Sequence, residues 1–275
     1  MKPAPFDYVA AQSLAEVHDV LAAEGGDARV LAGGQTLVPM LSMRLARPKV
    51  LIDIMRLPEL DRIVVEGDAI RVGAGVTQAT LLSWPELAER QPLMAAALPW
   101  VGHAQTRSRG TVCGSVAHAD PSAEIALALV GLDGAIELTQ RRRRRRVAAT
   151  EFFTGLMTTA RQDDELIEAV YIPARKPGQG YAFREFGRRH GDFAIVACAA
   201  VADARRIRFA VGGVADRPLA RDLDADTGPA LDEALDAFAW DLGARDDLHA
   251  TARYRRELVR RMGRETVEEA CRCRA

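Results

Sequence analysis

A strand-like segment that runs directly into paired glycines constrains the fold of this chain more than any other feature. In RVLAGGQTLVPM, residues 29–40, the apolar Val30 and Leu31 precede Gly33 and Gly34, and a second apolar segment follows. Glycine has no Cβ, so it tolerates a left-handed backbone or the close approach of another group. The pattern predicts a strand, a bare loop and a helix in succession. The loop is either a plain turn or a backbone that something else approaches closely.

The residues around this loop predict a small α/β unit over residues 1–60. Residues 13–26 begin with a serine suited to N-capping, carry apolar residues at helical spacing and end in two glycines. Residues 28–31 and 49–54 are short apolar runs typical of buried strands. Between them, residues 37–48 are apolar at helical spacing and end at a proline.

A larger mixed α+β unit is expected over residues 61–175. It begins with a hairpin around Glu66-Gly67-Asp68. Further strands are expected at 134–140, 145–150 and 165–173, and helices at 77–84, 86–102, 125–132 and 151–160. Residues 103–124 are polar and rich in small residues, which predicts a loop-rich region of the kind that carries function.

A cluster of proline and glycine at residues 173–180 predicts a domain boundary. Beyond it, over residues 176–275, we expect three antiparallel strands at 180–187, 193–204 and 206–214. Two helices, at 229–243 and 251–273, are expected to follow. The fold class is therefore α+β.

Composition limits the possible functions. The chain has 275 residues, 48% of them hydrophobic, and a net charge of −1. This charge gives no global field that would recruit nucleic acid or an anionic membrane. We expect neither a signal peptide nor a transmembrane segment. The four cysteines do not form a disulfide framework in a chain of this size, so we expect reduced thiols and a cytoplasmic location.

Common catalytic and nucleotide motifs are missing. The sequence has no G-x-x-x-x-G-K-[ST], no H-E-x-x-H and no G-x-S-x-G. Gly73 and Gly75 resemble the start of a dinucleotide fingerprint, but Gln78 replaces its third glycine and a hairpin precedes it. Cys113 and His118 could form a nucleophile pair, although a buried thiol that fills space is the more common role for such a cysteine.

Six consecutive arginines, Arg141 to Arg146, lie between two expected strands. Such a run can bind nucleic acid. Without interleaved aromatic residues, and in a chain of nearly neutral charge, it is more typical of a solvated hairpin.

A second segment rich in small residues complements the glycine loop. Residues 111–115, TVCGS, are followed at 120–124 by DPSAE. Both segments offer backbone N–H groups that bulky side chains do not hide, together with hydroxyl or amide donors. A pyrophosphate needs several such donors at once. Glu124 could complement the start of a helix or accept hydrogen bonds from a ribose or an adenine.

Three stretches together resemble the FAD-binding medium subunit of the xanthine dehydrogenase and carbon monoxide dehydrogenase family of molybdenum hydroxylases. Residues 31–54 are similar to a first flavin motif, A-G-G-[QH]-[ST]-L. Residues 105–124 are similar to a second, T-[IV]-G-G-[NS], with a downstream acidic residue. Residues 183–200 resemble the start of a C-terminal flavoprotein domain. The resemblance covers essentially the whole chain and implies a two-part FAD-binding domain followed by this C-terminal domain.

The resemblance also implies a set of FAD-binding residues. In the first motif and its flanks, the implied residues are Val30, Leu31, Ala32, Gly33, Gly34, Gln35, Thr36 and Leu37. The backbone of residues 32–36 would wrap the FAD pyrophosphate. The second motif contributes Thr111, Gly114 and Ser115. Glu124 would lie near the FAD adenosine, and Ile167 would pack near the flavin. Arg184 lies near the position where some members of the family have a lysine that contacts FAD. Phe193 lies where carbon monoxide dehydrogenases have an aromatic residue that guards the isoalloxazine ring. Cys113 departs from the family, which has glycine there, and a Cβ at that position would cost about 1 kcal/mol if φ is positive.

The implied function is electron transfer within a larger complex. A large subunit would hold the molybdopterin cofactor, a small subunit two [2Fe–2S] clusters, and this chain the FAD that passes electrons to an external acceptor, in a dimer of heterotrimers. Two other functions stay open. One is a stand-alone FAD oxidoreductase of the vanillyl-alcohol oxidase-like group, and the other is a nucleic-acid-binding module that uses the arginine run.

Overall fold

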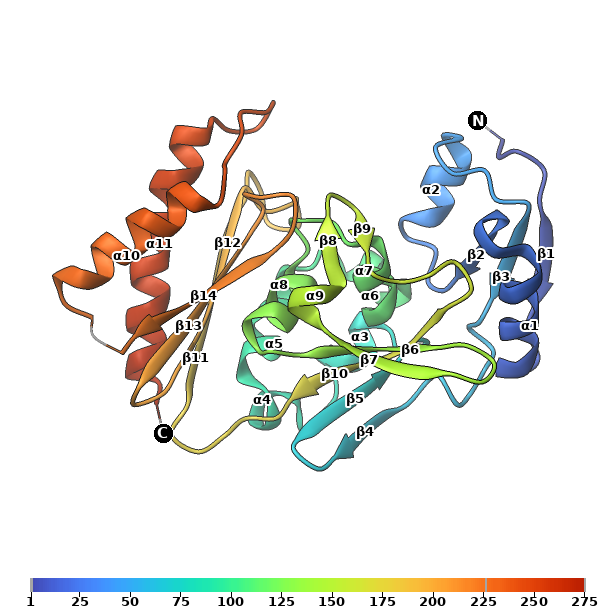
Figure 1. Ribbon diagram of the computed structural model, residues 1–275, viewed down its shortest axis with the longest axis horizontal. Coiled ribbons are helices and arrows are strands. Elements are labelled where there is room, and N and C mark those ends of the chain that lie inside the picture. The colour runs from blue at the N-terminus through green and yellow to red at the C-terminus, as the bar shows by residue number, and fades with distance from the viewer. Residues whose placement is uncertain (1, 226, 275) are drawn as a thin grey trace.

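The computed structural model describes residues 2–225 and 227–274 and arranges them as three sheet-based parts in a row (Figure 1). The N-terminal part lies at one end, a larger middle part lies in the centre, and the C-terminal part lies at the other end. The α+β class expected from the sequence is confirmed.

The N-terminal part is a three-stranded parallel sheet with helices, in strand order β1-β3-β2. The side chain of Ser13 caps α1 by accepting a hydrogen bond from the N–H of Glu16 at 3.2 Å. The strand β1, whose residues are exposed or half-buried, was not predicted, and neither was the short 3-10 turn η1. The elements are β1 (Asp7–Ala10), α1 (Leu14–Glu24), η1 (Gly25–Asp27), β2 (Ala28–Leu31), α2 (Leu37–Ser42) and β3 (Val50–Asp53).

The middle part is built on a five-stranded antiparallel sheet in the order β4-β5-β10-β6-β7. The predicted hairpins are present, and Gly67 takes a φ of 61° in the first turn. The strands are β4 (Ile63–Glu66), β5 (Ala69–Gly73), β6 (Ala135–Thr139), β7 (Arg144–Ala148) and β10 (Leu166–Pro173).

Short helices cover one side of this sheet and fill the space toward the C-terminal part. Every residue of α8 is buried, because the helix lies between the middle part and strands β12 to β14 of the C-terminal part. The helices are α3 (Gln78–Leu82), α4 (Leu87–Arg90), α5 (Pro92–Ala97), η2 (Leu98–Trp100), α6 (Ala104–Arg109), α7 (Val112–His118) and α8 (Glu124–Gly131).

Two expectations for the middle part are wrong. The segment 103–124, expected to be mainly loop, contains α6 and α7. The helix expected at 151–160 ends early, because α9 (Ala149–Phe152) gives way to the hairpin of β8 (Phe153–Gly155) and β9 (Thr158–Thr159). Met157 turns the chain there with a φ of 50°, and the threonines that follow favour an extended backbone.

The C-terminal part has four strands rather than the three expected, in the order β11-β12-β13-β14. The missed strand is the charged LARDLD segment, whose Asp222 pairs with Arg206 and Arg208 of the neighbouring strand. α10 and α11 cover one face of this sheet, and α5 and α8 pack on the other. The elements are β11 (Gly180–Phe186), β12 (Val196–Ala202), β13 (Arg206–Gly212), β14 (Leu219–Asp224), α10 (Pro229–Asp241) and α11 (Ala252–Arg272).

The arginine run forms the turn between β6 and β7 and continues along β7. Arg144 pairs with Glu168 at 3.2 Å, Arg145 binds both oxygens of Glu165, and Arg146 stacks on the ring of Tyr171. The hairpin is confirmed, and since Arg141 also pairs with Asp19 at 3.0 Å, four of the six arginines bind groups of the chain itself.

No helix within the described ranges combines the length and the apolar character that crossing a bilayer would require. Those same residues contain no group of three or more His, Cys, Asp or Glu side chains placed to hold a metal ion.

Candidate functional site

The two segments rich in small residues meet in space. Gly33 packs so closely on the backbone of Arg109 and Gly110 that a Cβ on Gly33 would collide with the Arg109 carbonyl oxygen and lie 2.9 Å from the Gly110 Cα. The loop that follows β2 is therefore pressed against the segment that leads into α7. Gly34 lies in the left-handed region with a φ of 72°, which favours glycine.

The first loop has unused backbone donors. Within the described part of the chain, none of the N–H groups from Gly33 to Leu37 donates a hydrogen bond. The loop carbonyl oxygens are in use, since Gly34 accepts from Val38 and Gly33 accepts from the side chain of Gln35. Consecutive free N–H groups on an exposed turn form a concavity that suits an anion.

The second segment is a capped helix start rather than a free loop. The hydroxyl of Thr111, which is 2% exposed, accepts a hydrogen bond from the N–H of Gly114 at 2.9 Å. The N–H of Gly114 is thereby occupied. The hydroxyl of Ser115 makes no hydrogen bond within the described residues and lies on the half-buried side of α7.

Cys113 causes no backbone strain. It lies in the first turn of α7, outside the set of residues with positive φ. Its buried thiol points into the core toward the carbonyl oxygen of Val72, at 3.6 Å. Burial raises the pKa of this thiol to about 12, which argues against a nucleophilic role.

Glu124 begins α8 as a buried carboxylate. It is 7% exposed, and in the described residues no side chain donates a hydrogen bond to it. Burial raises the pKa of Glu124 to about 7. The charge of Asp120 adds to this effect, whereas the N–H of Glu124 itself and the charge of Arg107 oppose it. An unpaired buried carboxylate is costly, so its presence suggests that it meets a ligand.

Glu185 is the functional candidate that the sequence reasoning missed. It lies on β11, opposite Ala197 of β12, and its Oε2 is buried without a hydrogen-bond partner. Burial, with a smaller contribution from the charge of Glu124, raises the pKa of Glu185 to about 8. The alternation of side chains along a strand could have identified Glu185 from the sequence. Glu185 is adjacent to the predicted Arg184, so its side chain faces the opposite side of the sheet.

The structure does not bring Arg184 to this site. Its guanidinium pairs with Glu265 at 3.3 Å and with Glu269 at 2.9 Å, both on α11. It therefore faces the helix-covered side of the C-terminal sheet, away from α8. Alternation along β11 explains the difference, because neighbouring residues of a strand point to opposite faces.

Ile167 and Phe193 lie in contrasting surroundings. Ile167 is buried in β10, at a bulge in its pairing with β6. Phe193 is 73% exposed on the loop between β11 and β12. That loop is held against the middle part, since the ring of His190 stacks on Trp100 with centroids 5.2 Å apart.

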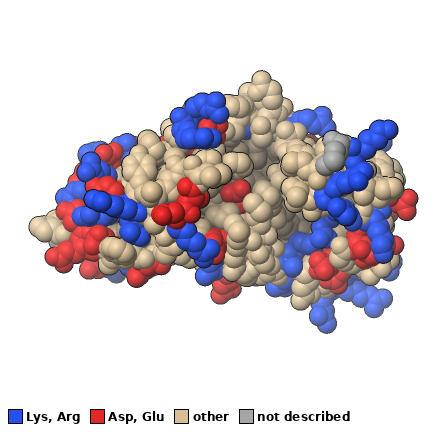
Figure 2. Space-filling view, turned by 90° about the horizontal axis from the view of Figure 1, so that it is seen from above, with Lys and Arg blue, Asp and Glu red and all other residues tan. Residues whose placement is uncertain are grey.

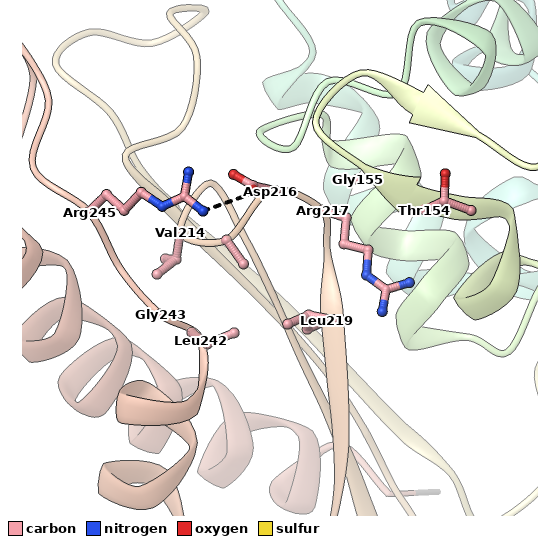
Figure 3. A pocket seen from close by; sticks show the side chains of 10 residues that line it. Thr154, Gly155, Val214, Asp216, Arg217, Leu219, Leu242, Gly243 and Arg245 are labelled. Atoms are coloured by element: carbon pink, nitrogen blue, oxygen red, sulfur yellow. Dashed lines mark hydrogen bonds and ion pairs between the residues drawn. The ribbon is translucent and has the colours of Figure 1, made fainter.

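Seen from above, the molecule has a hollow near its centre (Figure 2). Lys and Arg gather mainly toward the two ends, whereas mostly uncharged residues surround the hollow, with acidic atoms beside it. A separate pocket of about 310 Å³ lies elsewhere, where the β8–β9 hairpin meets the β13–β14 turn and the end of α10 (Figure 3). Its rim is held by an ion pair between Asp216 and Arg245 at 3.1 Å. It contains none of the residues predicted from the sequence.

The geometry fits an extended ligand that carries phosphate at one point and hydrogen-bond donors at another. The free N–H groups of Gly33 to Leu37 suit the phosphates. The buried carboxyl groups of Glu124 and Glu185 suit hydroxyl or amine groups. A dinucleotide such as FAD has both features.

Comparison with known families gives two adjoining matches. The family described as the FAD binding domain in molybdopterin dehydrogenase matches residues 4–175. The family described as the CO dehydrogenase flavoprotein C-terminal domain matches residues 181–270.

Individual relatives match over nearly their full length. The chain is 39% identical to the nicotine 6-hydroxylase medium subunit of Paenarthrobacter nicotinovorans, over 98% of this chain and 99% of that subunit. It is 33% identical to the carbon monoxide dehydrogenase medium chain of Hydrogenophaga pseudoflava, over 98% of each chain. A solved structure of carbon monoxide dehydrogenase from Hydrogenophaga pseudoflava superimposes with a TM-score of 0.91 at 32% identity and 100% coverage of both chains.

Proposed function

The chain belongs to the family of FAD-binding medium subunits of the molybdenum hydroxylases, and from that premise we propose how its residues hold FAD and what the subunit does. It is an oxidoreductase subunit. FAD, when bound, supplies the redox chemistry of its isoalloxazine, and the protein supplies binding, orientation and electrostatics.

We propose that the FAD pyrophosphate lies on the first glycine loop. The observation that carries this assignment is the run of unused N–H groups from Gly33 to Leu37, held against Gly110 by the bare face of Gly33. Ser115, with its free hydroxyl, adds a donor from α7. Thr111 and Gly114 act by shaping the start of that helix, because their own hydrogen bond occupies both of them.

The remaining proposed contacts flank this loop. Glu124 receives hydroxyl or amine groups of the cofactor. Ile167 supports the site from the buried face of β10, and Phe193 covers the cofactor from the loop between β11 and β12. The residues on either side of the glycines that complete the contact surface are Val30, Leu31, Ala32, Gln35 and Thr36. We leave Arg184 out of the set because its charge is paired with α11.

We propose that the division of the chain follows its sheets. Residues 1–60 contain the parallel sheet, residues 61–175 the five-stranded sheet, and residues 176–275 the four-stranded sheet. The first two parts together form the FAD-binding domain.

We propose that the subunit works in a complex with a large molybdopterin-binding subunit and a small subunit with two [2Fe–2S] clusters, arranged as a dimer of heterotrimers. Its relatives are medium subunits or chains of such enzymes. Electrons would reach FAD from the clusters and leave to an external acceptor. Free cysteines support a reducing, cytoplasmic location.

The decisive experiment is to purify the chain alone, add FAD, remove excess cofactor and record the visible flavin absorption. We expect a retained flavin band. A chain that is folded by circular dichroism but never retains FAD would contradict the assignment. The stand-alone oxidase alternative is not favoured, because this chain spans the length of whole medium subunits. That alternative would require substrate to reduce the flavin without partner subunits.

A further inference from the structure

The short helix α6 lies between the two loops that the proposed function places on the cofactor. It begins after its N-cap, His103, and ends before its C-cap, Gly110. Its six residues rise 1.5 Å each and span about 9 Å. The first glycine loop meets the C-terminal end of α6, where Gly33 packs on the backbone of Arg109. The loop between β11 and β12, residues 187–195, meets the N-terminal end.

Two ring contacts hold the β11–β12 loop at that end. The ring of His190 stacks on Trp100, the last residue of η2, with ring centroids 5.2 Å apart. The next residue, Gly191, has a φ of 87° and lies against the ring of His103, so that a Cβ on Gly191 would be 2.6 Å from Nδ1 and would displace the ring. The loop is therefore packed on Trp100 and His103 just before Phe193.

The polar contacts of the same loop do not reach the middle part. Arg188 and Arg189 both pair with Asp192, at 3.9 and 3.2 Å. In the described residues, the hydrogen bonds and ion pairs of the loop join it to itself or to other elements of the C-terminal part. The ring contacts are therefore what attaches this loop to the middle part.

The turn that carries Trp100 and His103 is held by Arg107 of α6. The guanidinium of Arg107 donates hydrogen bonds to three carbonyl oxygens of this turn, those of Pro99, Val101 and Gly102, at 3.3, 2.9 and 3.0 Å. Hydrogen bonds from a charged donor are stronger than those between neutral groups. The two ring-bearing residues are thus fixed relative to the helix that also touches Gly33.

We propose that Trp100 and His103 are positioning residues, and that α6 is a strut that sets the separation between the glycine loop and Phe193. The inference rests on the proposed function, which puts the FAD pyrophosphate on the glycine loop and the ring of Phe193 over the cofactor. Because Phe193 is 73% exposed, its own packing does little to place the ring, and the anchored loop places it instead. Trp100 and His103 act through Phe193 and do not touch the cofactor.

Limited trypsin digestion of the purified chain, with the cut sites identified by mass spectrometry, tests the anchor without cofactor. Trypsin can cut after Arg188 and Arg189, whose side chains are 59% and 78% exposed, when the loop opens. We expect Trp100→Ala and His190→Ala each to speed this cut about three- to tenfold, the effect of losing one aromatic contact. Trp100→Phe should restore a rate close to that of the parent. Cleavage at the exposed turn 141–143 is the internal reference and should not change.

The matched control is Trp240→Ala. Trp240 is 60% exposed on α10, and its ring lies under the guanidinium of Arg256 on α11. Its loss should leave the cut in the β11–β12 loop at the parent rate. If Trp100→Ala does not fold, His190→Ala decides, because it removes the same contact from an exposed loop residue. A folded His190→Ala variant that is cut no faster than Trp240→Ala overturns the inference.

The rate of FAD release, followed by the recovery of flavin fluorescence after dilution, tests whether the anchor acts through Phe193. Trp100→Ala and Phe193→Ala should each speed release, and the double variant should release FAD no faster than Phe193→Ala alone. Effects that add in the double variant overturn the positioning role, since Trp100 would then act by another route. A folded parent that gives the expected digestion pattern but never retains FAD overturns the proposed function, and the role of Phe193 with it, while the anchoring of the loop stands.

Discussion

Gly33 is pressed against the main chain of Arg109, so that any side chain at residue 33 would collide with the Arg109 carbonyl oxygen. This contact explains why residue 33 is a glycine, which the sequence alone did not reveal. Gly33 joins the two segments proposed to bind the cofactor to each other and also leaves the loop backbone open. The sequence left two interpretations of this loop open, a plain turn or a backbone that another group approaches closely, and both are partly right. The turn needs Gly34, and the group that approaches Gly33 closely is another part of the same chain.

Replacing Gly33 with alanine should destabilise the fold by about 1–3 kcal/mol, the range typical of overpacking, and should weaken FAD binding at least tenfold, because the loop can no longer seat against Gly110. Urea unfolding and FAD titration measure the two effects. Gly155→Ala is the matched control, since nothing lies within 4 Å of a Cβ added there and its φ is not positive. A Gly33→Ala variant as stable and as tight a binder as Gly155→Ala would contradict the packing argument.

Cys113 should matter for packing rather than for the cofactor. Cys113→Gly introduces the glycine that the resemblance leads us to expect, but it places glycine in a helix and removes a buried thiol, so we expect a loss of roughly 1–2 kcal/mol in unfolding free energy. FAD affinity should stay within about twofold. A large change in affinity at unchanged stability would mean that the thiol faces the cofactor after all.

The sequence predicted most of this fold because its elements are locally consistent. Ser13 caps the first helix, Gly67 turns the first hairpin, and apolar runs mark the buried strands. The failures occur where tertiary contacts override local signals. The strand β14 was missed because its charged residues pair across the sheet rather than pack in a core.

For the candidate site, the sequence predicted two loops but not the contact between them. That Gly33 meets Arg109 depends on a contact 76 residues away in the chain, which no local pattern encodes. Arg184 was placed by its similarity to a position in relatives, whereas the side to which it points is set by the register of β11 with β12. The same register places Glu185 on the face toward α8.

Arg71 should be essential for the stability of the middle part. Its guanidinium binds Glu137 at 2.9 Å and Glu168 at 2.8 Å, and both carboxylates are buried. Arg71→Met leaves two buried charges without their main partner and should cost about 3–5 kcal/mol. Arg142→Met is the control, because Arg142 is exposed and forms no ion pair within the described ranges; it should change the unfolding free energy by less than about 0.5 kcal/mol. Equal effects in thermal or urea unfolding would refute the role given to this network.

Glu124 should make the FAD-free chain less stable as the pH rises. Burial raises its pKa to about 7 in the folded protein, whereas an unfolded glutamate titrates near 4.5. Between these values the folded state binds more protons than the unfolded state, so the free energy of unfolding falls as the pH rises from about 4.5 to about 7 and is constant above. Glu124→Gln removes this penalty. The variant should therefore be more stable than the parent at pH 8, by something on the order of 2 kcal/mol, and similar to it at pH 4. Urea unfolding at both pH values measures the difference, with the exposed Glu151→Gln as control. If Glu124→Gln is no more stable than the parent at pH 8, the Glu124 carboxylate is solvated or paired in the folded chain. The argument that an unpaired buried carboxylate awaits a ligand would then be wrong.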